Sequence, residues 1–167
     1  MKKSICLNVF FPVLVFLIPS CCSRDEHKED AAKEIPRIEQ AIHNCIGWAG
    51  NKDIKLLYSV IANDSGFLEV HPDGRVVTGF DEFKKGEEFW MQPGFRAIRY
   101  EIRDFQIILS RSGDVAWWFC MLDDINEWKG QPANWENTRW TGVLEKRDGN
   151  WIIVQQHFSF ACNNGMR

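Results

Sequence analysis

The sequence predicts an α+β fold in which three N-terminal helices pack in a strongly bent antiparallel sheet. Apolar residues at helical spacing are confined to the first half of the chain, and residues 95–160 contain long runs with strand-like alternation. The last two runs meet at Asp148-Gly149, a dipeptide typical of tight β-hairpin turns. Helices followed by strands, rather than alternating with them, are typical of α+β architecture.

The first 20 residues are predicted to be a lipoprotein signal peptide. A short basic start precedes an apolar run, residues 5–18, that is too short to span a bilayer comfortably. Ile18-Pro19-Ser20-Cys21 resembles the bacterial lipoprotein cleavage motif, so we expect the lipid on Cys21, with Cys22 or an ordinary secretory signal as alternatives. The mature protein is then expected in the bacterial cell envelope, on the periplasmic side or the cell surface, with only its lipid in the membrane.

Residues 21–33 are predicted to form a flexible charged tether, because almost all of them are charged or small. Residues 34–163 are long enough for one domain. The chain has 20 basic and 23 acidic residues and a net charge of −3, and it has no basic patch, which argues against a nucleic-acid partner. Cys45, Cys120 and Cys162 are widely spaced, so no metal site is expected, and nothing indicates a cofactor.

The segment before residue 95 is expected to contain three helices, with one short strand before the third. Asp53 is a plausible N-cap for the second helix, and Pro72-Asp73-Gly74 has the composition of a turn. A strand over residues 66–71 precedes that turn. The helices are expected at residues 34–50, 53–62 and 80–90.

Two long strands should follow. Residues 95–110 alternate but change phase after Ile102, which predicts a bulge or a sharp bend. Residues 113–123 are apolar on both faces, so both sides of this strand should be covered, with Trp117 and Trp118 pointing to opposite sides. Residues 126–134 are expected to be a connection.

The hairpin turn fixes a register for the last two strands. If Asp148 and Gly149 are the turn residues, Leu144 faces Ile153 and Trp140 faces His157. The face shared by these pairs is apolar near the turn and polar at its far end, as expected for the wall of a pocket. Its far end carries Trp140, Gln155, His157 and Ser159.

The segment W-T-G-V-L-E-K-R-D-G-N-W-I-I-V-Q-Q-H-F-S-F resembles the final hairpin of the nuclear transport factor 2-like superfamily. The element order of residues 34–160 is similar to that of its SnoaL-like and ketosteroid-isomerase-like domains. The resemblance implies a cone-shaped fold with an internal cavity and a homodimer formed through the outer face of the sheet. That face is expected to carry Val143, Ile152, Val154, Phe158 and Phe160. Because the fold hosts many activities, it does not select one.

Several residues are candidates for the cavity. His157 could move a proton near neutral pH, with Asp123 as the partner carboxylate and Asp64 or Asp124 as alternatives. His71 is a weaker candidate at the mouth. Trp128 and Trp135 would form a lip over the cavity or simply anchor a loop. The expected ligand-binding residues are Tyr58, Trp90, Trp118, Trp140, Gln155 and His157.

The favoured function is binding of a small apolar or amphipathic molecule by a lipid-anchored domain, because apolar walls with a few polar groups are typical of small-molecule sites. One alternative is a SnoaL-like or ketosteroid-isomerase-like enzyme that transfers protons on a carbonyl compound. The other is a dimeric interaction module whose cavity is filled by its own side chains.

Overall fold

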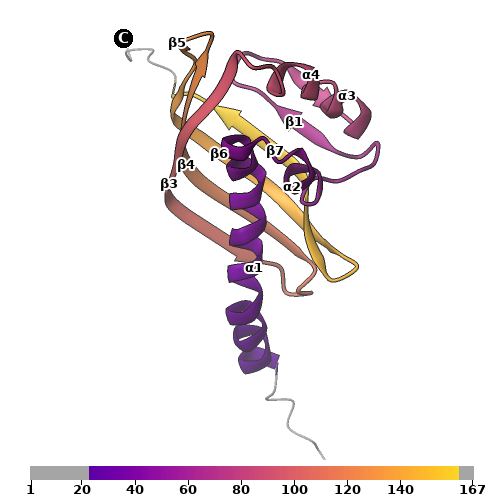
Figure 1. The fold of residues 1–167 in the computed structure, drawn as a ribbon. Helices are drawn as coiled ribbons and strands as arrows, with labels where there is room; N and C mark the ends of the chain where they lie inside the picture. The colour runs from indigo at the N-terminus through magenta and orange to yellow at the C-terminus, as the bar shows by residue number, and fades with distance from the viewer. Residues whose placement is uncertain (1–22, 162–167) are drawn as a thin grey trace, which may run out of the picture.

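The computed structural model describes residues 23–161 and shows a few helices held by one curved sheet (Figure 1). The expected signal peptide, Cys21, and the end of the domain at residue 163 lie outside the described residues. Among the described helices, none is long and apolar enough to cross a membrane.

The long helix α1 (Ser23–Asn51) packs against the sheet with its apolar stripe (Figure 1). Residues 23–33, expected to be a flexible tether, continue this helix. Glu, Lys and Ala, which favour helix, are frequent in the segment, so it can be helical without burying apolar surface. The buried stripe consists of Ile38, Ala41, Ile42, Cys45 and Trp48.

The other helices are shorter than expected. In α2 (Ile54–Tyr58), the Asp53 side chain accepts a hydrogen bond from the Leu56 amide at 3.1 Å, which confirms the predicted cap. The chain leaves the helix early because Ile61 forms a parallel bridge with Ile153. The helix expected at 80–90 is divided at Lys85-Gly86 into α3 (Phe80–Lys84) and α4 (Glu87–Trp90).

The sheet has the order β2-β1-β7-β6-β4-β3, with β5 paired to β4. All its pairs are antiparallel except β1 with β7, which is parallel. β2 was not predicted, and β4 extends into the expected connection because its end pairs with β3 and β5. The strands are β1 (Leu68–Val70), β2 (Val76–Thr78), β3 (Phe95–Leu109), β4 (Val115–Trp128), β5 (Gln131–Pro132), β6 (Trp135–Arg147) and β7 (Asn150–Ser159).

The sheet bends where the sequence changes phase. The β3–β4 register shifts between Arg103 and Gln106, and Asp104 has a φ of 54°, which confirms the predicted irregularity in this strand. Trp118 is 2% exposed on the helix side of β4, whereas Trp117 is 44% exposed on the other side. The two tryptophans therefore point in opposite directions, as predicted.

The β6–β7 hairpin follows the predicted register only near its turn. Asp148 and Gly149 have φ values of 50° and 78°, as a type I′ turn requires, and Leu144 pairs with Ile153. The next pair is Val143 with Gln155, so β7 contains a bulge.

The bulge reverses the faces of β7 beyond it, because one extra residue exchanges inner and outer positions. His157 pairs with Thr141 rather than Trp140 and is exposed, while Gln156 and Phe158 are buried. The prediction that Gln155 and His157 share the inner face with Trp140 is therefore wrong. So is the prediction that Phe158 points outward.

Candidate ligand-binding cavity

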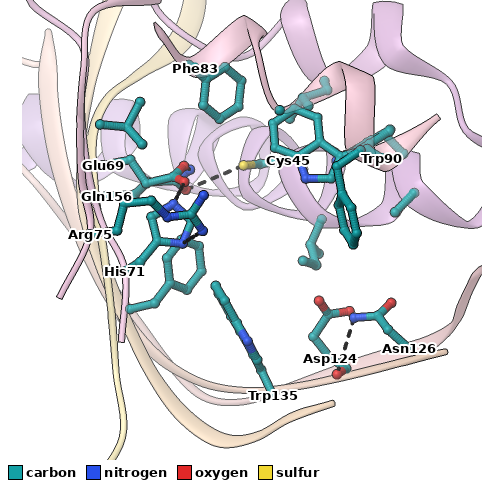
Figure 2. Close-up of a pocket in the computed structure, with 18 of the residues that line it drawn as sticks. Cys45, Glu69, His71, Arg75, Phe83, Trp90, Asp124, Asn126, Trp135 and Gln156 are labelled. Carbon is teal, nitrogen blue, oxygen red and sulfur yellow. Dashed lines mark hydrogen bonds and ion pairs between the residues drawn. The ribbon is translucent and has the colours of Figure 1, made fainter. Parts of the chain in front are cut away.

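An open cavity of about 580 Å³ lies between α1, the sheet and the segment that carries β1, β2, α3 and α4. This volume is within the range of small-molecule sites. Polar groups gather at two places on its wall, one around Glu69 and one around Asp124 (Figure 2). The aromatic residues on the wall are Trp48, Phe83, Phe89, Trp90, Phe95, Trp135, Trp140 and Phe158.

The first polar group is centred on a buried carboxylate. The parallel register of β1 and β7 places Glu69 opposite Gln156, and the Gln156 amide donates to the Glu69 carboxylate. The Gln156 carbonyl accepts from Trp140 Nε1 at 3.2 Å and from Cys45 Sγ at 3.5 Å. Because Glu69 is 4% exposed and Gln156 is 2% exposed, these bonds replace water for both side chains.

His71 extends this network toward the mouth of the cavity. Its Nε2 contacts the Glu69 carboxylate, and its Nδ1 lies 3.1 Å from a guanidinium nitrogen of Arg75. Since a guanidinium only donates, Nδ1 must accept, and the ring proton on Nε2 is donated to Glu69. The ring also packs edge-on against Trp135, with 5.8 Å between centroids. In this arrangement both ring nitrogens of His71 have a polar partner.

The second polar group is Asp124 with Asn126, both on β4. Figure 2 shows the Asp124 side chain directed into the cavity, across the open space from Glu69 and His71. Burial raises the pKa of Asp124, and a side-chain hydrogen bond with Asn126 offsets this only in part. The protonated form of this carboxyl is therefore favoured more than in an exposed aspartate.

Two of the predicted aromatic residues, Trp90 and Trp140, line the cavity, and two others do not. Trp118 lies behind Trp140 in a T-shaped contact with 5.5 Å between ring centroids. The Tyr58 hydroxyl donates to Glu87 at 2.7 Å, and burial together with this carboxylate raises the pKa of Tyr58. Of the two tryptophans expected to form a lip, only Trp135 lines the cavity.

The predicted pair of catalytic residues does not reach the cavity. Asp123 points away from Asp124, because neighbouring strand residues face opposite sides. Its carboxylate accepts a hydrogen bond from the Asn137 backbone amide at 2.6 Å and one from an Arg103 guanidinium nitrogen at 2.8 Å. These bonds lower the pKa of Asp123. His157 lies on the outer face, beyond the bulge. The candidate proton-transfer groups in the cavity are therefore His71 and Asp124 rather than His157 and Asp123.

The residues of the cavity wall that were not among the predicted site residues include Glu69, Asn126, Gln156 and Phe158. A usable signal existed for Glu69, which is a charged residue between Leu68 and Val70 in a short strand. Among residues 23–161, no group of His, Cys, Asp and Glu side chains is arranged to hold a metal ion. Cys45 and Cys120 are buried free thiols.

Comparison with known proteins agrees with this fold. Residues 38–163 match the model of the SnoaL-like domain. A proposed dehydratase of the NTF2-like family from Streptomyces avermitilis superposes with a TM-score of 0.67 at 16% identity, covering 78% of this chain and 97% of that one. An NTF2-like protein with a cystatin-like fold from Novosphingobium aromaticivorans superposes with a TM-score of 0.64 at 10% identity. This match covers 88% of this chain and 94% of that one.

An NTF2-like protein from Cytophaga hutchinsonii gives a TM-score of 0.60 at 16% identity, covering 74% of this chain and 95% of that chain. No curated protein has significant sequence similarity to the chain. These structural similarities confirm the predicted fold.

Proposed function

Because the chain belongs to the family of SnoaL-like domains, we propose that it binds a small apolar or amphipathic molecule in its aromatic cavity. The observation that carries this proposal is an open cavity of about 580 Å³ with aromatic walls and two separate polar groups. Aromatic walls hold an apolar body, and a few polar groups orient it. The open cavity also argues against an interaction module whose interior is filled by side chains.

Binding without chemistry is favoured because His71, the histidine that would act as the base, is already engaged. His71 Nδ1 accepts from Arg75, and its Nε2 proton is donated to Glu69. A base needs a free lone pair within hydrogen-bond reach of the substrate, so Arg75 would first have to leave His71.

The second candidate function is acid/base catalysis on a carbonyl compound. It is supported by the presence of His71 and Asp124 on one cavity, and burial raises the pKa of Asp124 toward values useful in proton transfer. The structural neighbour from Streptomyces avermitilis is itself only a proposed dehydratase. If the protein is an enzyme, His71→Ala should abolish turnover, whereas His157→Ala on the outer face should leave it unchanged.

Native mass spectrometry of the protein, released gently from its own host, tests the binding proposal. A protein that carries a bound small molecule supports it and identifies the ligand class. A ligand-free protein would move support toward a transient enzyme substrate.

Two substitutions on α1 provide a matched pair for this measurement. Ala49 lines the cavity, so Ala49→Phe adds a ring that should displace the ligand. Gly50 is the next residue, and a Cβ built there meets nothing within 4 Å, so Gly50→Phe adds the same ring outside the cavity. Loss of the ligand from both variants, or from neither, would contradict its assignment to the cavity.

We further propose a lipid anchor on Cys21, export to the cell envelope, and a homodimer formed through the outer face of the sheet. The dimer proposal is supported by the large exposed apolar side chains Ile108 and Trp117 on this face, which are paired neighbours on β3 and β4. Mass spectrometry of the membrane fraction should find diacylglycerol on Cys21. A Cys21→Ser variant should lose membrane attachment, and retention on the membrane would point to Cys22 or to another attachment.

A further inference from the structure

The polar group around Asp124 contains an unused hydrogen-bond acceptor. Asn126 is 6% exposed, its backbone amide donates to Asn134 at 3.0 Å, and its Nδ2 donates to the Asp124 backbone carbonyl at 3.5 Å. Its Oδ1, however, has no partner among the described residues. An unpaired buried acceptor is costly, and Asn126 is one of the residues that line the cavity.

Asp124 supplies a second acceptor beside the first. It lines the cavity, and its cross-strand partner on β6 is Trp135, which lines the cavity too. Paired residues on one face have Cβ atoms about 5 Å apart, so the Asp124 and Trp135 side chains start from neighbouring points of the cavity wall. A carboxylate beside an aromatic ring is a suitable environment for an organic cation.

The distribution of charge in the cavity also favours a cation. Both acidic side chains in its interior, Glu69 and Asp124, lie away from the rim, whereas Arg75 and Lys85 have side chains that are 61% and 72% exposed. Lys85 is paired with Glu82 at the surface. A carboxylate ligand would therefore meet acidic groups inside the cavity, while an ammonium group would meet acceptors.

We propose that the cavity selects ligands that carry an amine, with the ammonium group donating to Asp124 and to Asn126 Oδ1 beside the Trp135 ring. This inference rests on the proposed binding function and specifies its ligand class. The apolar part of the ligand then lies against the aromatic wall around Trp90.

The test uses three probes that share one apolar body: 4-phenylbutylamine, 4-phenylbutan-1-ol and 4-phenylbutyrate. The full chain is expressed and its product is placed in nanodiscs of zwitterionic lipid, with empty nanodiscs as the reference for isothermal titration calorimetry. We expect the amine to bind about tenfold more tightly than the alcohol, because charge-assisted hydrogen bonds are the stronger ones. The carboxylate should bind more weakly than the alcohol.

The Asp124→Asn variant keeps the shape of the side chain and removes its charge. It should reduce the preference for the amine over the alcohol to about threefold or less. Asp104→Asn is the matched control, because it makes the same change at an exposed bulge position of β3 and should keep the wild-type preference.

The outcomes separate this inference from the binding proposal. Equal binding of all three probes overturns amine selectivity and leaves the binding proposal intact. Binding of none of them overturns both. An amine preference that persists in Asp124→Asn overturns the assignment to Asp124. The wild-type series decides on selectivity even if the variant does not fold.

Discussion

Substitution of Gly142 tests whether the packing of the core requires the bulge in β7. A Cβ built on Gly142 lies within 3.0 Å of two atoms of the Trp118 indole and of the backbone oxygen of Gln155, at the bulge. Trp118 cannot easily move, because it is 2% exposed and packs against Trp140. Gly142→Ala must therefore displace a core indole, the bulged backbone, or both.

Overpacking a core usually costs about 1–3 kcal/mol. We expect Gly142→Ala to lower the free energy of unfolding by about 3 kcal/mol, at the upper end of this range, because the new methyl group meets backbone as well as side-chain atoms. For a domain of this size, that loss lowers the melting temperature by roughly 6–12 °C. Urea denaturation followed by circular dichroism and tryptophan fluorescence gives the free energy of unfolding directly.

Gly50→Ala is the matched control, because it adds the same methyl group at the end of α1, where nothing lies within 4 Å. It should stabilise the protein by about 0.5–1 kcal/mol, since alanine favours helix over glycine. A Gly142→Ala variant within about 0.5 kcal/mol of wild type would show that the core can yield at this point. The bulge would then need another explanation.

Three further predictions concern stability, thiol chemistry and assembly. Burial raises the pKa of Asp124 above its ordinary 3.8, so its ionisation destabilises the folded state as pH rises from about 4. The advantage of Asp124→Asn in urea denaturation should therefore grow with pH, and an advantage that shrinks would refute the assignment. Burial also raises the pKa of Cys45, and raises that of Cys120 to about 12, so peptide mapping should find neither alkylated by iodoacetamide without urea. Alkylation of either in the native protein would contradict its burial. Trp117→Lys should convert the proposed dimer to a monomer in light scattering, and an unchanged mass would place the interface elsewhere.

Local signals predicted the parts of the fold that depend on neighbouring residues. Asp148-Gly149 predicted the last hairpin because its turn needs two positive φ values, which this dipeptide readily adopts. The phase change after Ile102 predicted the irregular stretch of β3, and Asp53 predicted the cap of α2. In each case the cause lies within a few residues of the signal.

The cavity depends on contacts between distant segments, which the sequence alone does not reveal. The close approach of Gly142 to Trp118 and to the backbone of β7 accompanies the bulge that turns His157 outward. The parallel pairing of β1 with β7 places Glu69 beside Gln156. Asp124 was recognised only as an alternative to Asp123, because the side of the strand that faces the cavity was unknown.

The pairing of β1 with β7 also sets the order in which the cavity is completed during synthesis. Glu69 and Gln156 are separated by 87 residues, so the neighbour of β1 is made last. Until those final 10 strand residues have emerged, β1 is paired only with β2 and the Gln156 side of the wall around Glu69 is missing. A chain that stops early therefore keeps α1 and most of the sheet but has no binding site. Ligand binding thus reports that translation has reached the end of β7, and such non-local closure is expected to make folding slow.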